Sequence, residues 1–309
     1  MSFELTVLGS SSALPTSKRF PAAHVLNVYE HFFLIDCGEG TQMQLRKFKI
    51  RMGKINHIFI SHLHGDHVFG LFGLFSTFNL MGRQHPLHIY AHSDIQHIIG
   101  FYREHFTNQQ DYEIILHPVN AGHTDVIYED RLLTVEIIPL RHRIFTVGFL
   151  FKEKQRLKNI RKDMIEKYNI PVRDILSIKE GSDLMTQDGR LIKNEQLTLP
   201  SFRPRSYAYF TDTLFTKKNA DKIKQVDLLY HEATFLHDQK KLARQTYHST
   251  ALQAGEMAKA AEAKKLLIGH FSSRYKDVSA LVNEAATVFQ PVFAAKDGDK
   301  YSIELTREE

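Results

Sequence analysis

The amino-acid sequence predicts an α/β protein in which layered β-sheets carry helices on their faces. Short apolar runs recur along most of the 309 residues, and segments with an apolar period near 3.6 separate several of them. Strands that alternate with helices, together with stretches of consecutive strands, are typical of layered α/β folds. Hydrophobic residues make up 43% of the chain and charged residues 24%, which excludes a mainly disordered protein.

The expected elements follow from these runs in chain order. The strands are Phe3–Leu8, Phe32–Ile35, His57–Ile60, Leu87–Tyr90, Leu132–Ile138, Val147–Phe151, Tyr207–Thr211, Leu228–His231, Leu266–Gly269 and Tyr301–Leu305. The helices are Gly40–Lys49, Ile95–Phe106, Thr250–Ala263 and Val278–Phe289. The first helix follows a Gly-rich turn, the third has a Ser/Thr start, and Pro291 stops the last.

One long segment, residues 152–205, interrupts this alternation. It is polar and charged, and it shows few strand or helix patterns of any length. Its first part carries these charged residues: Lys152, Glu153, Lys154, Arg156, Lys158, Arg161, Lys162, Asp163, Glu166 and Lys167. A long excursion of this kind is either a solvated insertion without a role or a mobile basic arm that grips a polyanion. We therefore expect a single domain over residues 1–309, with residues 152–203 inserted as a flexible basic arm.

Charge and cysteine content constrain the partners and the compartment. The formal net charge is +5 and the sequence pI is near 9.0, which is consistent with a polyanionic partner. The single cysteine, Cys37, allows no intramolecular disulfide and cannot form a cysteine-based zinc site alone, and we interpret it as a small buried residue. The amino terminus lacks the basic and apolar regions of a secretory signal, and no apolar stretch approaches the roughly 18 residues that span a bilayer. We expect a cytoplasmic protein without membrane association.

The sequence His62-Leu63-His64-Gly65-Asp66-His67 places four metal ligands in one short turn, directly after the apolar run Ile58–Ile60. Imidazole nitrogens and carboxylate oxygens suit zinc in a hydrolytic site. Four such groups in six positions converge only if the loop after a strand folds around a small cation. A solvated, His-rich surface turn is the alternative, but an aspartate between histidines after a buried strand argues against it.

Three further residues have the position that such a site needs. His142, Asp212 and His270 each follow an apolar strand by a residue or a few, where α/β folds collect functional groups. A single histidine at a strand end is more often structural. As a set with the first cluster, the three indicate one shared metal site.

These residues together resemble the metallo-β-lactamase superfamily and, within it, the ribonuclease Z family of tRNA 3′-processing endonucleases. The His/Asp cluster with His142, Asp212 and His270 carries the superfamily likeness. The narrower likeness rests on Asp36-Cys37-Gly38-Glu39-Gly40-Thr41-Gln42, Ser61, Gly70-Leu71-Phe72-Gly73-Leu74, His231-Glu232-Ala233-Thr234-Phe235, His248-Ser249-Thr250-Ala251 and Gly269-His270-Phe271-Ser272-Ser273-Arg274-Tyr275.

The resemblance implies a four-layer αβ/βα sandwich, the metallo-β-lactamase fold, with a protruding arm insertion. It implies two Zn²⁺ ions per subunit, although Mn²⁺ or another divalent ion would also suit the ligands. His62, His64 and His142 would hold one ion, Asp66, His67 and His270 the other, and Asp212 would bridge them. The implied function is endonucleolytic removal of the 3′ trailer from precursor tRNA, which leaves a 3′-hydroxyl, by an enzyme that is usually a homodimer.

Two catalytic roles follow from phosphodiester hydrolysis by two metal ions. Asp66 would ligate one metal and also orient the attacking water or accept its proton. His248 would donate a proton to the leaving ribose 3′-oxygen, as the matching histidine does in the family; alternatively it only opens the helix Thr250–Ala263. Glu232 would orient His248 or a metal ligand.

Three further interpretations concern the surroundings of the metals. Asp36 either accepts the second N–H of a metal-bound histidine or stabilises the turn ahead of Gly38 and Gly40. Ser272, Ser273 and Arg274 are expected to contact phosphate oxygens.

The chain departs from the family pattern in the arm, where a Gly-Pro pair is missing after Tyr168-Asn169-Ile170-Pro171. Whether Arg173 compensates by touching phosphate stays open. Two other functions compete with tRNA processing: a dinuclear hydrolase of small phosphodiesters, sulfate esters or lactams, and a non-catalytic RNA-binding protein that keeps the fold.

Overall fold

The computed structural model describes residues 2–106, 111–120 and 126–308. The chain divides into two compact units. The larger unit comprises Met1–Lys152 and Ser206–Ile303, and the smaller one comprises Glu153–Arg205 and Glu304–Glu309.

Seven strands of the larger unit form sheet I, in the spatial order β18-β1-β2-β3-β4-β5-β6. Their bounds are β1 Phe3–Gly9, β2 Ala23–Val28, β3 His31–Ile35, β4 Ile55–Phe59, β5 Leu87–Ala91, β6 Ile114–Pro118 and β18 Lys300–Ser302. The strands β3, β4, β5 and β6 run parallel. The segments that follow them therefore begin at one edge of the sheet.

Seven other strands form sheet II, in the order β17-β16-β15-β14-β9-β8-β7. Their bounds are β7 Val126–Glu129, β8 Leu133–Pro139, β9 Val147–Glu153, β14 Ser206–Phe210, β15 Leu228–Glu232, β16 Leu266–Gly269 and β17 Val292–Ala294. The strands β14 to β17 are parallel, whereas β9 runs antiparallel to β14. Sheet II thus also gathers several strand ends at one edge.

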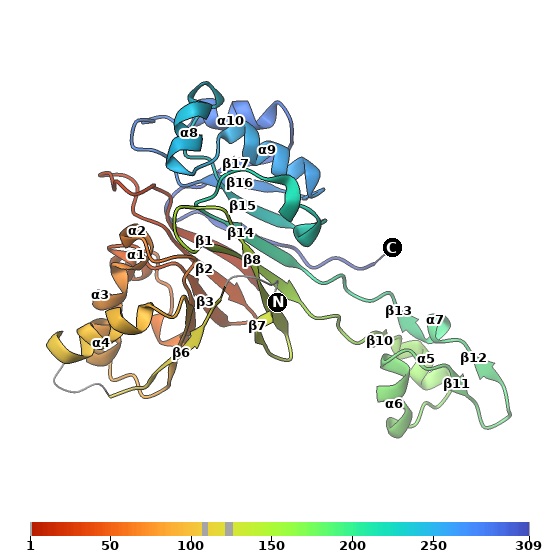
Figure 1. Ribbon diagram of the computed structural model, residues 1–309. Coiled ribbons are helices and arrows are strands. Elements are labelled where there is room, and N and C mark those ends of the chain that lie inside the picture. The colour runs from red at the N-terminus through yellow and green to blue at the C-terminus, as the bar shows by residue number, and fades with distance from the viewer. Residues whose placement is uncertain (1, 107–110, 121–125, 309) are drawn as a thin grey trace. The chain divides into compact units, whose positions relative to one another are not determined.

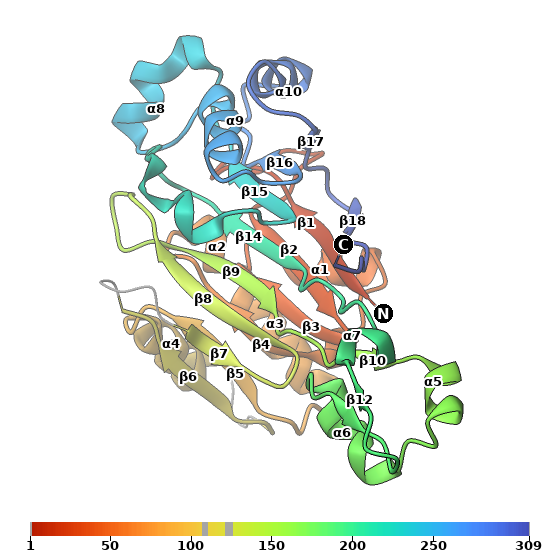
Figure 2. The same ribbon diagram turned by 90° about the vertical axis from the view of Figure 1, so that its right-hand side faces the viewer.

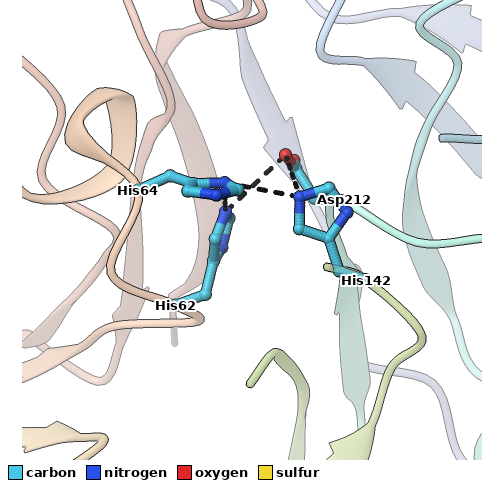
Figure 3. Close-up of side chains that lie close together, drawn as sticks. All are labelled: His62, His64, His142 and Asp212. Carbon is cyan, nitrogen blue, oxygen red and sulfur yellow. Dashed lines mark hydrogen bonds and ion pairs between the residues drawn. The ribbon is translucent and has the colours of Figure 1, made fainter. Parts of the chain in front are cut away.

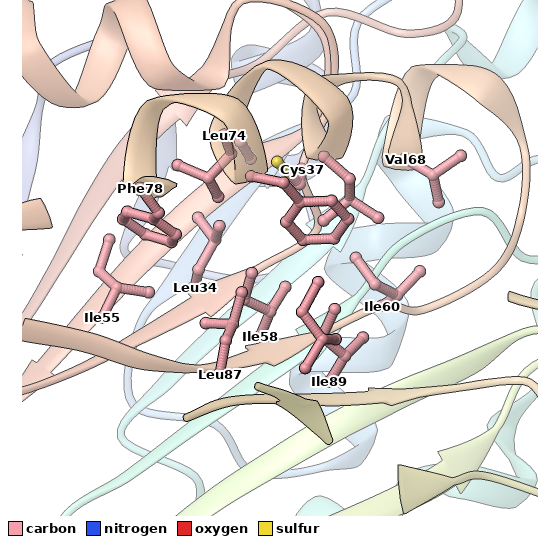
Figure 4. Close-up of a cluster of buried hydrophobic side chains, with 14 of the residues drawn as sticks. Leu34, Cys37, Ile55, Ile58, Ile60, Val68, Leu74, Phe78, Leu87 and Ile89 are labelled. Carbon is pink, nitrogen blue, oxygen red and sulfur yellow. The ribbon is translucent and has the colours of Figure 1, made fainter. Parts of the chain in front are cut away.

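Alternate side chains of the strands face opposite layers, and this alternation produces the cores. In β3 and β4, Leu34 and Ile58 pack against helices, whereas Phe33 and Phe59 join the apolar cluster shared with sheet II. Figure 4 shows the outer cluster under the helix that begins at Gly70. Burial of each such side chain stabilises the fold by about 1.5–3 kcal/mol.

Helices cover the outer face of each sheet, so the larger unit has four layers, helix–sheet–sheet–helix (Figures 1 and 2). The helices on the side of sheet I are α1 Thr41–Lys47, α2 Gly65–Val68, α3 Gly70–Leu80 and α4 Ile95–Phe106. Those on the side of sheet II are α8 Lys240–Thr246, α9 Ala251–Ala260 and α10 Ser279–Ala286. Short 3₁₀ turns complete the unit: Met52–Lys54, Lys217–Asn219, Asp221–Ile223 and His237–Gln239. The layered α/β prediction is confirmed.

The smaller unit has more regular structure than its sequence pattern indicates. Its elements are β10 Asn159–Ile160, α5 Lys162–Lys167, α6 Val172–Lys179, β11 Leu184–Met185, β12 Leu191–Ile192, α7 Asn194–Leu197 and β13 Thr198–Leu199. Ile170, Ile178, Leu184, Ile192 and Leu197 form its buried apolar cluster. None of these elements exceeds eight residues, so they are too short to produce a recognisable period.

Among the helices that the structure describes, none combines the length and the apolar character needed to cross a bilayer.

Candidate metal centre

Sheet I supplies four of the predicted ligands through the loop after β4, which holds His62 and His64, and the first turn of α2, which holds Asp66 and His67. The ring centroids of His62 and His64 lie 4.7 Å apart, and those of His62 and His67 lie 4.1 Å apart. Asp66 Oδ2 lies 3.5 Å from His67 Nε2. The turn therefore brings all four side chains to one point.

Sheet II supplies the other three from separate strand ends. His142 lies in the loop between β8 and β9, Asp212 follows β14, and His270 follows β16. Their ligand atoms meet those of sheet I in two groups, each within 4.8 Å: His62, His64, His142 with Asp212, and Asp66, His67, His270. Figure 3 shows the first set, with His62, His64 and His142 converging on the Asp212 carboxylate. We call His62, His64 and His142 the first group, and Asp66, His67 and His270 the second group.

The two oxygens of Asp212 face different groups. Oδ2 lies 3.6 Å from His62 Nε2 and 3.7 Å from His142 Nε2. Oδ1 lies 3.5 Å from His67 Nε2 and 3.1 Å from His270 Nε2. One carboxylate is thus placed between two sets of nitrogen donors, as a bridging ligand would be.

Hydrogen bonds orient two histidines of the first group. His62 Nδ1 lies 3.0 Å from Ser61 Oγ, and His142 Nδ1 lies 3.0 Å from the carbonyl oxygen of Tyr247. The Tyr247 carbonyl can only accept, and Ser61 Oγ donates its own proton to Asp36 Oδ2 at 2.8 Å. Both Nδ1 atoms therefore carry the proton. The Nε2 lone pairs point toward His64 Nδ1, at 3.0 Å from His62 and 3.3 Å from His142, where a cation would take them.

Carboxylates stand behind the histidines of the second group. His67 Nδ1 donates to Asp36 Oδ2 at 2.7 Å. His270 Nδ1 lies 3.0 Å from Thr234 Oγ1, which donates to Glu232 Oε2 at 2.6 Å. A carboxylate behind an imidazole fixes its tautomer and makes the opposite nitrogen a better ligand.

The buried donors fit a metal ion. Among the described residues, the Nε2 atoms of His67 and His270 are buried without a hydrogen-bond partner, which is costly unless a cation takes their lone pairs. Burial lowers the pKa of His67, but Asp66, Asp36 and Asp212 raise it well above its usual value. Without a metal, the negative charge of these three carboxylates favours a proton on His67. A divalent cation would neutralise the same charge and take the place of that proton.

Asp212 and His62 have the protonation states that coordination requires. Burial of Asp212 opposes ionisation, but His270, His67 and His248 hold its pKa well below the usual range. Burial lowers the pKa of His62 well below its usual value, so its imidazole is neutral. Ionised carboxylates and neutral imidazoles are the forms that bind divalent metals.

Asp36 is a hub between the sheets. Its carboxylate accepts hydrogen bonds from the backbone N–H and the hydroxyl of Ser61, both at 2.8 Å, from His67, and from the Tyr209 hydroxyl at 2.7 Å. Its φ is +55°, a left-handed conformation that costs a non-glycine residue free energy, and His270 shares it with φ +57°. Of the two interpretations of Asp36, the one in which it supports a histidine of the candidate metal site agrees with its direct hydrogen bond to His67.

His248 lies beside the centre and contacts Glu232. Its Nδ1 lies 3.0 Å from Glu232 Oε1, while Glu232 also accepts from the Thr213 backbone N–H at 2.8 Å. Burial lowers the pKa of His248, but Glu232, Asp212 and Asp66 raise it to about 9. His248 therefore favours its protonated form. The ligand atoms of Asp212, His248 and His270 also fall within 4.8 Å, but a protonated imidazole donates rather than coordinates.

A pocket of about 450 Å³ opens onto these residues. It is lined by Ser12, Ala13, His64, Gly65, Asp66, His142, Arg143, Asp212, Thr234, Phe235, Thr246, His248, His270 and Ser272. Of the three expected phosphate contacts, Ser272 lines this pocket. The guanidinium of Arg274 donates to Ser272 Oγ at 3.1 Å and lies over the Phe235 ring at 4.9 Å. Ser273 is not among the described residues that line the pocket.

Cys37 is fully buried in the core under the helices of sheet I. Burial raises the pKa of its thiol to about 12, so it stays neutral. This agrees with its interpretation as a packing residue.

Sequence reasoning missed two supporting contacts. The hydroxyl of Tyr209 on β14 reaches Asp36 on the other sheet, and the Tyr247 carbonyl reaches His142. Thr234 was noticed only as part of a motif, although its hydroxyl contacts both Glu232 and His270. Tyr209 lies in the strand that Asp212 follows, but the sequence gives no sign of which partner a buried tyrosine meets.

Comparisons with known proteins identify the family of this chain. A family model described as "Anti-Pycsar protein Apyc1" matches residues 3–157, which hold the first cluster and His142. Ribonuclease Z of Phocaeicola vulgatus is 48% identical over 98% of this chain and 98% of its own length. Ribonuclease Z of Porphyromonas gingivalis (strain W83) is 46% identical over 96% of this chain and 97% of its own.

Solved structures share the fold. Human tRNase Z, short form, superposes with a TM-score of 0.71 at 26% identity, over 97% of this chain and 99% of its own. The metallo-β-lactamase fold protein YhfI of Bacillus subtilis superposes with a TM-score of 0.69 at 19% identity, over 98% and 100%, and shows the fold alone.

Proposed function

Because the chain belongs to the ribonuclease Z family, and is thus a metal-dependent hydrolase of phosphodiester bonds, we propose that it removes the 3′ trailer from precursor tRNA. The cut would leave a 3′-hydroxyl on the tRNA. The observation that carries the proposal is the position of Asp212, whose two oxygens face two separate donor groups in a protein with whole-chain ribonuclease Z relatives.

The proposed ligands of two Zn²⁺ ions per subunit are the two groups around this carboxylate. The first group would hold one ion, the second group the other, and Asp212 would bind both; Mn²⁺ or another divalent ion would suit the same donors. When bound, two such ions lower the pKa of water and stabilise negative charge on a phosphate.

The protein's own groups would then position water and move protons. Asp66 lines the pocket and would orient the attacking water or accept its proton. His248 also lines the pocket, and as a protonated imidazole it would donate to the leaving 3′-oxygen. Glu232 would keep His248 protonated and hold its ring in position.

The smaller unit, which contains most of the predicted arm of residues 152–203, is the proposed tRNA-binding arm. Residues 153–205 contain 12 Lys/Arg and 8 Asp/Glu, a formal charge of +4, and residues 304–309 of the same unit lower its total to +2. An excess of cations on a separately packed unit suits an RNA backbone that extends beyond the cleaved bond. The side chain of Arg173 is 85% exposed. It is therefore available to contact an RNA phosphate, the role considered for it because the Gly-Pro pair is missing.

A homodimer in the cytoplasm is the proposed state of the enzyme. Large apolar side chains are exposed on α1, on the residue before α3 and on α4: Met43, Phe69, Phe101 and Phe106 are each at least 50% exposed. Phe69 lines two neighbouring hollows, one with Met43 and one with Phe101. An apolar surface of this kind on a soluble protein is best covered by a second copy. The molar masses of the wild type and of Phe69→Asp, measured by light scattering, test this. If the wild type has the mass of a monomer, as Phe69→Asp should, the dimer is excluded.

The function is tested with a 3′-extended tRNA and an unstructured RNA of equal length. We expect strong preference for the tRNA, and equal cleavage of both would remove the tRNA assignment. Deletion of residues 154–204 tests the arm, because Lys152 and Ser206 are paired across β9 and β14 and a tight turn can join them. The deletion should cripple tRNA cleavage and spare a small chromogenic diester; if tRNA cleavage survives, a small-diester hydrolase becomes the better interpretation.

A further inference from the structure

Arg143 lines the same pocket as His248 but is no part of the metal centre. Two contacts hold its side chain. Its Nη2 donates to the carbonyl oxygen of Gln245 at 3.0 Å, and its Cζ lies 5.8 Å from the centroid of the Tyr247 ring. An arginine fixed in this way keeps most of its five donors for another partner.

No acidic side chain in the described part of the chain forms an ion pair with Arg143, which is exposed. Two further exposed arginines are close to these residues in sequence: Arg141 lies two positions before Arg143, and Arg244 precedes Gln245. A guanidinium with free donors that faces a pocket for phosphodiester chemistry suits phosphate oxygens.

The neighbours of Arg143 indicate which phosphate it would meet. In the proposed reaction the leaving 3′-oxygen belongs to the last nucleotide of the tRNA, and His248 donates to it. His248 directly follows Tyr247, whose ring lies against Arg143. Arg143 therefore lies on the side of the centre that receives the tRNA end rather than the trailer.

We propose that Arg143 binds the phosphate on the 5′ side of the nucleotide that keeps the new 3′-hydroxyl. This inference rests on the proposed function and adds a specific contact to it. Arg143 would fix the last nucleotide of the tRNA, so that its 3′-oxygen meets His248 and the scissile phosphate meets the metal ligands. It would act as a substrate-binding residue.

The experiment uses a 3′-extended tRNA in which that one phosphate is replaced by an uncharged methylphosphonate. For the wild type, kcat/KM should fall about tenfold on the modified RNA, because a charge-assisted contact is lost. Arg143→Ala should lose about tenfold on the unmodified RNA and less than about twofold further on the modified one. Arg143→Lys, which keeps the charge without the planar fork, should fall in between.

Matched controls separate this role from a structural one. Arg131→Ala removes an exposed arginine ahead of the opposite end of β8 and should behave as the wild type on both RNAs. Metal content, measured by elemental analysis, should be the same in all four proteins. A methylphosphonate one nucleotide further from the cut should slow the wild type and Arg143→Ala equally.

Two outcomes would contradict the proposal and are distinguishable. If the methylphosphonate lowers kcat/KM of Arg143→Ala by the same factor as that of the wild type, Arg143 does not bind that phosphate. The proposed tRNA processing would be unaffected by this result. If the wild type hydrolyses a small diester but leaves the 3′-extended tRNA uncut, the proposed function fails and this contact fails with it.

Discussion

The two donor groups around Asp212 differ in what stands behind their histidines. In the first group, His142 is supported by a backbone carbonyl, and His62 reaches the carboxylate of Asp36 only through the Ser61 hydroxyl. In the second group, His67 contacts the carboxylate of Asp36, and His270 reaches that of Glu232 through Thr234. The two sites share one bridging residue, yet they should not bind metal equally well.

Burial does not divide the groups in the same way. His62, His67 and His270 are at most 1% exposed, whereas His64, Asp66 and His142 are half-buried. A carboxylate in direct contact with an imidazole makes it a stronger ligand. We expect the second group to retain its ion longer during chelation, and the following experiments can sharpen or break this contrast.

The largest effect is expected for Asp212→Ala, since one carboxylate serves both groups. Both ions should be lost, and activity should fall at least about 10³-fold, because several kcal/mol of transition-state stabilisation disappear. Elemental analysis and the tRNA assay measure this. Asp94→Ala, which removes a 66% exposed carboxylate, should change neither. Two ions retained in Asp212→Ala would exclude the shared ligand.

The contrast between the groups is tested by Asp36→Asn and Ser61→Ala. Asp36→Asn should weaken binding of one ion about 10- to 100-fold, as is usual for a lost carboxylate partner. Ser61→Ala removes the hydroxyl that links His62 to Asp36 but leaves the Asp36–His67 contact in place, and it should cost about tenfold or less. Competition with a chelator, followed by elemental analysis, gives both affinities. Equal losses would show that the supporting charge has no influence.

Glu232→Gln tests how His248 is kept protonated. His248 can donate only below its pKa, so activity falls as the pH rises through that value. Removal of the Glu232 charge lowers this pKa, and the alkaline limb of the kcat profile should move to lower pH by at least about one unit. The exposed Glu262→Gln should leave the profile in place. If the alkaline limb of the kcat profile does not move in Glu232→Gln, that limb reports the titration of a group other than His248.

The smallest effect is expected for Tyr209→Phe, which removes one of four hydrogen bonds to Asp36. Stability should fall by about 1 kcal/mol, and metal affinity of the second group should fall only a few-fold. Tyr207→Phe is a matched control, since its hydroxyl contacts His24 at 2.9 Å. Urea unfolding should show similar losses in both variants. A metal-affinity loss in Tyr207→Phe as well would mean that general loosening, and not Asp36, is responsible.

The convergence of the predicted ligands was easier to predict than their supports. His62, His64, Asp66 and His67 are near neighbours in sequence, so residue type and spacing suffice to bring them together. His142, Asp212 and His270 follow strand ends, which apolar runs reveal. Tyr209 could not be predicted to meet Asp36, because this contact joins two sheets and depends on how they pack.

Element prediction failed where local patterns are weak. The helix α3, Gly70–Leu80, was missed because Gly70 and Gly73 lower helix propensity. Gly70 is required there, since a Cβ would lie 2.1 Å from the Gly38 carbonyl oxygen. The strand β2, Ala23–Val28, is almost wholly buried and short, so it lacks the alternation that reveals strands.

The pairing of Lys152 with Ser206 has a consequence for how this enzyme could diversify. The chain leaves the larger unit at Lys152 and returns at its strand partner Ser206. Topologically, all residues between these two are therefore the loop of a β-hairpin. Lengthening or exchanging such a loop costs little closure entropy, about 0.6 kcal/mol for each doubling. Related proteins could therefore carry a different insertion at this position and bind a different substrate, while the residues of the metal centre stay unchanged.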